Sequence, residues 1–385
     1  MSTLSCVPLL YGLYGLSALL AVLFLHPYLF YPLSLRLFRA RPPGGGDGSR
    51  PSATLLFSAY NEEQALPAKL ANIAAIKALF PDLEVLAYSD MSSDSTLALL
   101  ESRPDLLRVI PATQRTGKAT GMRNMVEQAK GDVCIFTDAN VLLEPESVGR
   151  LLDHFRDPTI GGVSGTLRYI NDADSPTAAV GGLYWRLEEK IKALESRCGS
   201  MMGADGSIFA TRRALYPVVP PHLLDDMIAS LSVTFAGYRL ISAPDVHAFE
   251  RNTTDPRDEF HRKRRIACRA FNSHRHLWPH IARHFPLADQ YKYVSHKLLR
   301  WLGAPILMLS ILSLTLALAC DGHGRLAVLL WLAGGIALLL GEGLKWRPFA
   351  TITGMLVSIL ATFIGVLDAL CGRTYQTWAP AKSRD

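Results

Sequence analysis

The stretch VCIFTDAN, residues 133–140, decides how the rest of the chain is interpreted. Its first four residues are uncharged and typical of a strand covered on both faces, and polar residues follow at once. Because ligands of open α/β sheets bind beyond the carboxyl ends of the strands, we expect Asp138 at the mouth of a pocket. Asp138 and Asn140 can offer two oxygen atoms to one hard cation, which suits Mg²⁺ or Mn²⁺. Taken alone, the octapeptide fits a strand ending in a simple Asx turn equally well.

Three similar units precede this stretch, each an apolar segment followed by polar residues and a predicted helix. The apolar segments are residues 54–58, 83–88 and 107–110, and the polar residues after them include Tyr60, Glu62, Asp90 and Lys118. Asn61 is expected to cap a helix over residues 62–79. Four successive strand-then-helix units predict an α/β fold with a Rossmann-like parallel sheet and one ligand crevice.

The amino-terminal end is strongly apolar, whereas residues 51–288 have the composition of a globular domain. Residues 1–30 carry no charge, and the apolar run over 7–30 exceeds the ~20 residues that a spanning helix needs. A retained anchor fits this pattern better than a signal peptide, which has a basic start and a shorter apolar stretch. Basic residues at 36, 39 and 41 place the next domain in the cytoplasm by the positive-inside rule.

Three apolar runs, at about residues 301–320, 326–340 and 349–370, follow a segment over 285–300 that is expected at the membrane interface. Three full spans would place the basic residues Arg373, Lys382 and Arg384 outside the cell, against the positive-inside rule. Two alternatives therefore stand for the last run: it spans the membrane, or it is re-entrant or interfacial. We divide the chain into an anchor (1–40), a Gly/Pro-rich linker (41–51), a cytoplasmic domain (52–284), an interfacial helix with transmembrane segments (285–372) and a basic tail (373–385).

Composition argues against several classes of site. The six cysteines are scattered, without C-x-x-C spacing, so neither a disulfide framework nor a zinc site is predicted. The net charge of +6 comes largely from residues 251–300, but no aromatic-interleaved basic patch accompanies it. No nucleic-acid partner is therefore predicted. Anionic lipid or a diphosphate explains a basic cluster near a membrane at least as well.

Further candidate residues lie after the fourth strand. Asp205 and Gly206 occupy a polar loop before a strand, and Asp225 and Asp226 are adjacent acids at a helix start. Adjacent carboxylates repel each other, which can raise one pKa toward the range of a general base. Two acids stabilising the positive end of a helix dipole are the alternative. The glutamates of a helix over residues 183–197, Glu188, Glu189 and Glu195, are expected on a solvated face.

These motifs, in this order over residues 54–271, resemble the family 2 glycosyltransferases of the GT-A fold, inverting enzymes that use nucleotide-diphospho-sugars. The membrane frame is similar to that of bacterial polysaccharide synthases, relatives of the cellulose, chitin and hyaluronan synthases. The resemblance implies a donor-binding set of Tyr60, Glu62, Asp90, Lys118 and Asp138, with Asp90 at uracil or ribose and Lys118 at a phosphate. Asp138-Ala139-Asn140 resembles the metal-binding D-x-D signature with asparagine in the second place, which implies Mg²⁺ or Mn²⁺ at Asp138 and Asn140.

On the acceptor side, the resemblance implies Asp205, Gly206, Asp225 and Arg262, with Asp226 as the catalytic base and Arg265 assisting the leaving diphosphate. Asp225 replaces the family's more frequent glutamate. The stretch over 262–266 is similar to the Q-x-x-R-W element of the synthases, but Arg262 replaces glutamine and Ile266 replaces tryptophan. Loss of that aromatic platform weakens the case for processive polymerisation. A basic helix lying on anionic lipid is the alternative for this stretch.

The resemblance thus implies a multi-pass enzyme of the inner (plasma) membrane with a cytoplasmic GT-A domain. It would move a sugar to a lipid-linked or growing glycan acceptor in cell-envelope or extracellular polysaccharide synthesis, in contact with membrane lipid and polysaccharide-assembly proteins. One alternative is a single-sugar transferase that acts on a membrane lipid, and another is a non-catalytic subunit that binds nucleotide-sugar. The transferase hypothesis fails if Asp90, Asp138 and Asp226 lie far apart or on separate faces of the molecule.

Overall fold

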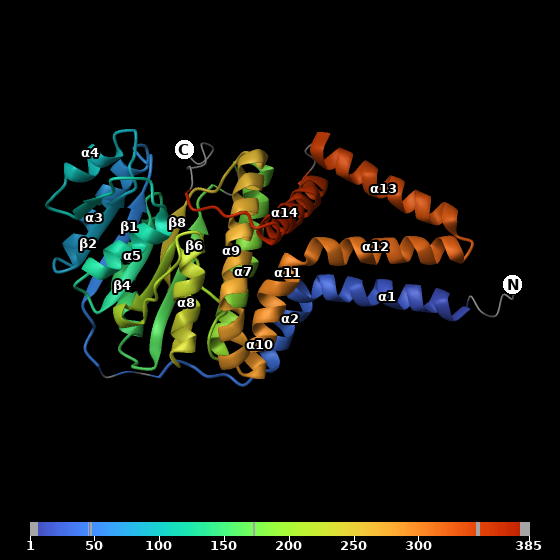
Figure 1. The fold of residues 1–385 in the computed structure, drawn as a ribbon, viewed down its shortest axis with the longest axis horizontal. Helices are drawn as coiled ribbons and strands as arrows, with labels where there is room; N and C mark the ends of the chain where they lie inside the picture. Colours follow the sequence, from blue (N-terminus) through green and yellow to red (C-terminus); the bar gives the residue numbers. More distant parts are fainter. Residues whose placement is uncertain (1–6, 45, 47, 172–173, 344–346, 378–385) are drawn as a thin grey trace.

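The computed structural model of the chain describes residues 7–44, 46, 48–171, 174–343 and 347–377. Figure 1 shows the sheet and its covering helices at one end of the molecule and long apolar helices extending away at the other end. Lys382 and Arg384, which entered the prediction of membrane sidedness, lie outside the described residues.

An eight-stranded sheet of order β3-β2-β1-β4-β7-β6-β8-β5 forms the centre of the fold. Its first four strands are mutually parallel, as predicted: β1 Ala53–Ala59, β2 Glu84–Ser89, β3 Arg108–Pro111 and β4 Val133–Asp138. The other strands are β5 Leu142–Leu143, β6 Ile160–Tyr169, β7 Ile208–Arg212 and β8 Arg239–Glu250. The expectation of a parallel sheet fails beyond β4, because β7 enters antiparallel between β4 and β6.

Helices cover both faces of this sheet. Those of the sheet region are α3 Leu66–Leu79, α4 Thr96–Glu101, α5 Lys118–Gln128, α6 Pro145–His154, the 3₁₀ turn η4 Arg213–Leu215 and α8 Asp225–Phe235. Successive side chains of a strand point to opposite faces, so Leu55 and Phe57 pack with Ile73 of α3 while Leu56 packs with Met122 of α5. These two apolar layers hold the carboxyl ends of β1, β2 and β4 at one edge.

The first predicted helix begins later than expected. Asn61 does not cap it, since its φ of 52° lies in the left-handed region and α3 starts only at Leu66. The Asn61 side chain instead accepts a hydrogen bond of 2.9 Å from the backbone N–H of Ser93. Residues 62–65 form a turn, and Pro67 lies in the first turn of the helix, where its missing N–H costs no helical hydrogen bond. Asn61 therefore ties the loop after β1 to the loop after β2.

A wall of helices separates the sheet from the apolar helices: α7 Pro176–Arg197, α9 Pro256–His284, α10 Leu287–Tyr293, the π-helical segment η5 Val294–Leu298 and α11 Leu299–Trp301 (Figure 1). Within this wall, the prediction that the α7 glutamates face solvent is wrong for Glu188 and Glu195, which are 7% and 0% exposed. The His296 ring lies between them, with Nε2 2.8 Å from Glu188 Oε1 and Nδ1 2.7 Å from Glu195 Oε1. The helical periodicity of the sequence identified the polar face of α7. It did not show that cationic residues about a hundred positions later in the chain cover this face.

We expect Glu188→Ala to lower the free energy of unfolding by about 3–5 kcal/mol, because it leaves buried cations without a counter-charge. Arg300 bonds the Glu188 carboxylate directly, and Lys297 Nζ lies 3.5 Å from Glu188 Oε1. Chemical denaturation of the detergent-solubilised chain measures the loss. The exposed Glu101→Ala is the matched control and should stay within about 0.5 kcal/mol of the parent. A loss below about 1 kcal/mol for Glu188→Ala would contradict this account of the network.

Within the described parts of the chain, four helices are long and apolar enough to cross a membrane. The first is α1 Val7–Leu25, which continues through η2 His26–Phe30, α2 Tyr31–Ser34 and η3 Leu35–Leu37; the others are α12 Gly303–Cys320, α13 Gly324–Gly343 and α14 Arg347–Leu370. α1 and α12 lie side by side, and Ser17 Oγ donates a 3.0 Å hydrogen bond to the Ser310 carbonyl. α12 and α13 form the predicted hairpin.

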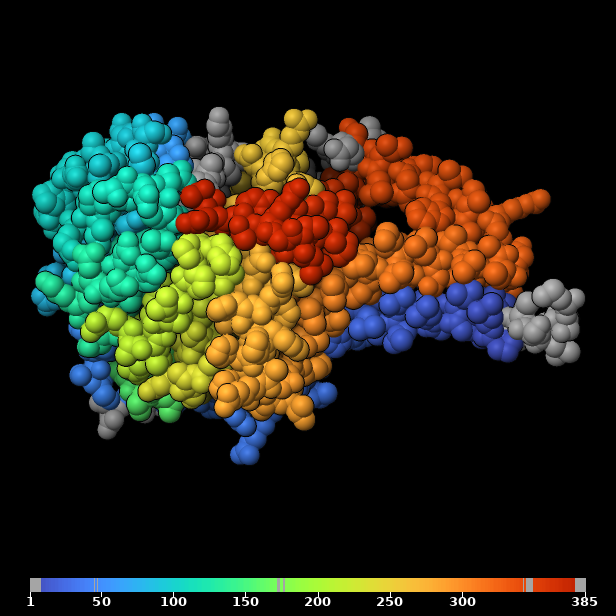
Figure 2. Space-filling view, in the orientation of Figure 1, coloured from blue at the N-terminus to red at the C-terminus, as the bar shows by residue number. Residues whose placement is uncertain are grey.

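The fourth apolar helix, α14, packs along α9 instead of extending away from the sheet. Arg264 of α9 bonds Asp368 of α14 at 2.5 Å. Beyond α14, Gln376 Nε2 lies 3.3 Å from the carbonyl oxygen of Thr116 and donates to it, so the described end of the chain reaches the sheet. Figure 2 shows this red segment lying across the gold surface of α9. Phe349–Leu370 of α14 is also a candidate membrane span by length and composition.

Candidate active site

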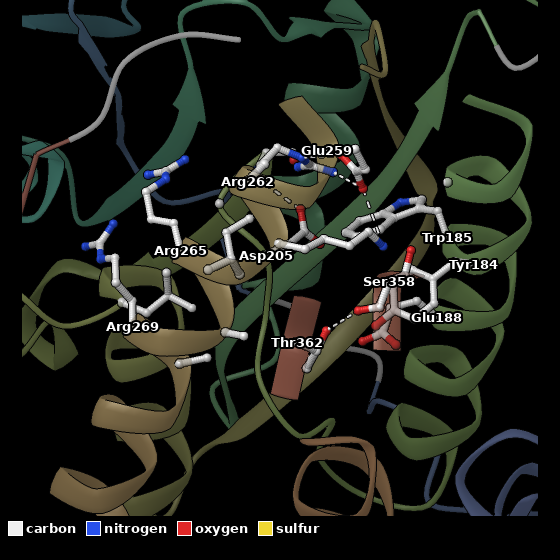
Figure 3. A pocket seen from close by; sticks show the side chains of 18 of the residues that line it. Tyr184, Trp185, Glu188, Asp205, Glu259, Arg262, Arg265, Arg269, Ser358 and Thr362 are labelled. Carbon is white, nitrogen blue, oxygen red and sulfur yellow. Dashed lines mark hydrogen bonds and ion pairs between the residues drawn. The ribbon is translucent and has the colours of Figure 1, made fainter. Parts of the chain in front are cut away.

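A cavity of about 1510 Å³ lies at the carboxyl ends of β1 and β4, with α7, α9 and α14 around it (Figure 3). Every predicted site residue except Asp90 lines it. The lining members are Tyr60, Glu62, Lys118, Asp138, Asn140, Asp205, Gly206, Asp225, Asp226, Arg262 and Arg265. Residues separated by up to about two hundred positions in the sequence therefore share one pocket.

The centre of the site is formed by Lys118, Asp138 and Asp226. Asp138 ends β4, Lys118 begins α5 and Asp226 lies in the first turn of α8. Lys118 Nζ is 2.5 Å from Asp138 Oδ1. A Cβ atom added to Gly206 would lie 2.8 Å from Lys118 Nζ and 3.3 Å from Asp226 Oδ2. Glycine at 206 thus lets the ammonium and the second carboxylate approach the same point.

The electrostatics of this centre suit proton transfer near neutral pH. Burial and the adjacent Asp225 carboxylate raise the pKa of Asp226 to about 7, and Lys118 limits the rise. Burial alone lowers the pKa of Lys118, but the carboxylates of Asp138, Asp225 and Asp226 raise it above its ordinary value. At pH 7 a charged Lys118 therefore lies beside a carboxyl group that can both hold and release a proton.

The structure places Asp90 differently from the prediction. Asp90 is fully buried and does not line the cavity. Its carboxylate accepts hydrogen bonds from the backbone N–H groups of Thr116 (2.7 Å) and Gly117 (3.0 Å) and from Arg115 Nε (3.2 Å). An acidic residue at a strand end predicted a ligand contact, but the two oxygens instead hold the loop that carries Lys118. Asp90 is in this geometry a positioning residue.

Arg115, which the sequence did not single out, forms part of the cavity wall. Its guanidinium lies over the Tyr60 ring, with Cζ 3.1 Å from the ring centroid. Tyr60 follows β1 and Arg115 precedes α5, so this contact joins two strand-end loops. The sequence indicated a role for Arg115 only by its position, three residues before Lys118 in the stretch R-T-G-K.

The predicted metal ligands offer a partial donor set. Asp138 and Asn140 both line the cavity, and the Asn140 amide donates a 3.1 Å hydrogen bond to Glu250 Oε1, which leaves its carbonyl oxygen as a ligand. Among the described residues, no group of three or more His, Cys, Asp or Glu side chains could hold a metal ion. Mg²⁺ is commonly held by one or two protein oxygens together with phosphate and water. The two side chains therefore fit a cation that binds together with a diphosphate.

Aromatic and charged residues of α7 form a second side of the cavity. Lys192 Nζ lies 2.5 Å from Glu189 Oε1 and 2.8 Å from Asp205 Oδ2, and 5.3 Å from the centroid of the Trp185 ring. The Trp185 indole N–H has no hydrogen-bond partner among the described residues. Trp185 was not predicted, because the resemblance to the synthases concerned an aromatic platform only at position 266. An aromatic ring on a cavity wall suits the apolar face of a sugar.

Basic residues spaced along α9 face the cavity from the opposite side. Figure 3 shows Arg262, Arg265 and Arg269 on successive turns of this helix. Arg262 Nε bonds Glu259 Oε2 at 2.9 Å, and Arg269 Nη2 lies 3.7 Å from Asp225 Oδ1. Arg269 was not predicted, although it follows Arg265 at the helical spacing of four. Its Nε has no hydrogen-bond partner within the described parts of the chain.

Comparisons with known proteins agree with this geometry. The family described as Glycosyl transferase family 2 matches residues 54–218. The chain is 22% identical over 225 residues to a poly-beta-1,6-N-acetyl-D-glucosamine synthase of Staphylococcus aureus, covering 56% of this chain and 54% of that protein. It is 26% identical over 191 residues to an N-acetylglucosaminyltransferase of Sinorhizobium fredii, covering 48% and 46%. The chain thus spans about half the length of these curated relatives.

One solved structure matches nearly the whole fold. It is the mannosyltransferase PcManGT from Pyrobaculum calidifontis in complex with GDP-Man and Mn²⁺, with a TM-score of 0.71 over 94% of this chain and 99% of that one. At 22% identity the likeness shows the fold alone. The fold and the family expected from the motifs are therefore confirmed. The chain carries a family 2 glycosyltransferase domain of the GT-A fold, framed by apolar helices that could span a membrane.

Proposed function

We propose that the chain is an inverting glycosyltransferase that moves a sugar from a nucleotide-diphospho-sugar to an acceptor during glycan synthesis at a membrane. The observation that carries the proposal is the meeting of Lys118, Asp138 and Asp226 in one cavity. The names of the relatives support glycan synthesis, since one makes poly-beta-1,6-N-acetyl-D-glucosamine. Because the chain spans about half of those relatives, sugar and acceptor are not inferred from their names.

The donor side consists of the strand-end loops. Lys118 and Arg115 supply positive charge to a diphosphate, and Tyr60 and Glu62 line the wall beside them. Asp138 and Asn140 would hold Mg²⁺ or Mn²⁺, which would neutralise the diphosphate. Support for a metal comes from the Mn²⁺ in the structural neighbour. Asp90 contributes by fixing the Thr116-Gly117 backbone.

Asp226 is the group placed to act as general base. The acceptor hydroxyl oxygen attacks the anomeric carbon while its proton passes to the Asp226 carboxylate. The bond between that carbon and the diphosphate breaks, and the nucleoside diphosphate leaves with the bonding electron pair. Arg265 and Arg269, on the cavity side of α9, are placed to stabilise the negative charge that develops there. A single displacement of this kind inverts the anomeric centre.

The apolar helices support a location in a membrane, and we propose the inner (plasma) membrane with the sheet domain in the cytoplasm. Arg36, Arg39 and Arg41 after the first apolar run support this orientation. Hydrogen bonds from Asn272 of α9 to the Arg373 carbonyl and from Gln376 to the Thr116 carbonyl support a position for Arg373 on the same side as the domain. Polysaccharide-assembly proteins remain proposed partners.

We expect chelation of divalent cations by EDTA to lower activity at least ~10-fold, and Mn²⁺ or Mg²⁺ to restore it, because the protein offers few metal ligands of its own. Release of nucleoside diphosphate from a panel of uridine and guanosine diphospho-sugars is the measurement. Full activity in EDTA would contradict the metal assignment. Absence of nucleoside diphosphate release with every donor and acceptor would favour the non-catalytic subunit and overturn the proposed function.

A further inference from the structure

The cavity does not end at the catalytic groups. Its wall continues onto side chains of α1, η2 and α14, namely Phe24, Leu25, Tyr28, Leu29, Ile352, Met355, Leu356 and Ile359. These residues belong to two of the four candidate membrane spans, Pro8–Leu37 and Phe349–Leu370. One continuous space therefore joins the donor-binding strand ends to segments that are apolar enough to lie in lipid.

This apolar half of the cavity has an open wall. Leu29 and Ile352 are each 52% exposed, and Met355 is 37% exposed. Side chains of this kind in a membrane segment contact hydrocarbon, whereas a soluble glycan would leave their apolar surface without a matching partner. The occupant favoured by this wall is a hydrocarbon chain.

Between the two halves lies a group of charges around Tyr184, which we call the neck. Lys263 Nζ lies 5.0 Å and Arg300 Cζ 5.6 Å from the Tyr184 ring centroid. Figure 3 shows Tyr184 and Glu188 of α7 close to Ser358 and Thr362 of α14. All charged members of the neck line the cavity: Glu188, Glu259, Arg262, Lys263, Lys297 and Arg300. Four cations thus meet two carboxylates, so the neck has an excess of positive charge.

Lys297 is a neck cation that lies beside the loop carrying Asp205 and Gly206. Its Nζ lies 3.5 Å from both Glu188 Oε1 and His296 Nε2, at the limit of hydrogen bonding, and its side chain is 21% exposed. Its Cε lies 4.0 Å from a Cβ built on Gly203, two residues before Asp205. An anionic group at Lys297 would therefore lie next to the loop that carries Asp205 and Gly206.

We propose that the acceptor is a membrane lipid whose headgroup contains a phosphate and ends in a hydroxyl nucleophile. The hydrocarbon chain occupies the apolar half, the phosphate lies at Lys297 in the neck, and the hydroxyl reaches Asp226, with Trp185 beside it. The hydroxyl proton passes to Asp226 and the nucleoside diphosphate departs, as in the proposed reaction. This inference rests on the proposed function and specifies its acceptor.

Two sources supply this chemistry, and binding to the full-length protein in detergent distinguishes them. The probes are polyprenyl-phosphoryl-glucose and phosphatidylglycerol, with polyprenol and diacylglycerol as chain-matched lipids without phosphate, measured by native mass spectrometry. At least one phosphate lipid should bind ~10-fold or more tightly than its neutral counterpart, and the tighter of the two identifies the source. Equal binding of the charged and neutral lipids would overturn the inference.

Two variants test the neck and the apolar half separately. Lys297→Ala should weaken binding of the phosphate lipid ~10-fold and leave the neutral lipid unchanged, and Lys297→Arg should restore it. Met355→Trp should block lipid binding, whereas Val357→Trp should not, because both residues of α14 are 37% exposed but only Met355 lines the cavity. If both tryptophan variants bind lipid like the parent, the chain does not enter this space and the inference fails. If the Lys297→Ala variant does not fold, the Met355→Trp variant still tests whether the lipid chain occupies the cavity.

Failure of this inference and failure of the proposed function give different results. If a soluble oligosaccharide supports nucleoside diphosphate release as well as the lipids do, only the lipid acceptor is wrong. If the parent protein transfers sugar to none of the lipids and to no oligosaccharide, and releases no nucleoside diphosphate, the proposed function falls.

Discussion

Asp226→Asn should lower the rate of sugar transfer by about 10²–10⁴-fold while donor binding changes little, because it removes a proton acceptor and keeps the size of the side chain. The carboxylate lies beside Lys118 at the point that the absent side chain of Gly206 leaves open. Transfer is measured as product formed per unit time, and donor binding by calorimetry with the nucleotide. The exposed Asp82→Asn is the matched control, because it makes the same chemical change away from the cavity.

The pH profile of the parent enzyme is a second test of Asp226 as the general base. Since burial and Asp225 raise the pKa of Asp226 to about 7, its carboxylate is mostly protonated below that pH and cannot accept the acceptor proton. The rate should therefore rise with pH through about 7 and level off above it. In Asp226→Asn the remaining slow rate should lack this acidic limb. A variant that retains more than about a tenth of the parent rate would exclude Asp226 as the base.

Lys118→Ala should have the second largest effect, with a loss of about 10²–10³-fold in kcat/KM. Its ammonium lies 2.5 Å from Asp138 and limits the pKa rise of Asp226, so removing it takes away a phosphate contact and one counter-charge for the base. The pKa of Asp226 should then rise further, which moves the acidic limb to higher pH. A merely structural lysine would not produce that shift.

The Lys118→Arg variant distinguishes the effect of the positive charge at position 118 from the effect of the side-chain shape. It keeps the positive charge and so should restore the position of the acidic limb, but the larger planar guanidinium does not fit beside Gly206 and should leave the rate reduced. Lys130→Ala, an exposed lysine just beyond α5, is the control for loss of charge. An acidic limb that stays in place in Lys118→Ala would contradict the coupling between Lys118 and Asp226.

The parts of the fold that sequence patterns predicted are those set by local chemistry. Apolar runs that end in polar residues located β1, β2, β3 and β4 within a residue or two, because a strand buried on both faces must be uncharged. The antiparallel entry of β7 was missed, since its pairing with β4 depends on contacts between residues far apart in the chain. The start of α3 was misplaced because asparagine favours both a helix cap and a left-handed turn.

In the candidate site, too, local motifs predicted some residues, whereas long-range packing determined others. Lys118, Asp138 and Asp226 could be proposed from motifs at element ends, where ligand-binding groups commonly lie. Asp90 was assigned to the ligand because a motif specifies a position in the chain but not which neighbour satisfies the carboxylate. Trp185 and Arg269 were missed because only the packing of α7 and α9 shows which of their faces borders the cavity. The solvated-face interpretation of Glu188 failed for the same reason.

The contact between Gln376 and Thr116 bears on how the protein should be handled. Gly117 leaves no room for a side chain there, since an added Cβ would lie 2.2 Å from the Gln376 carbonyl oxygen. A purification tag or fluorescent fusion joined behind this segment is expected to disturb the same loop, which leads into Lys118. Reporter groups are better inserted at the exposed Gly322 turn, which joins α12 and α13 at the end of the hairpin that Figure 1 shows farthest from the sheet.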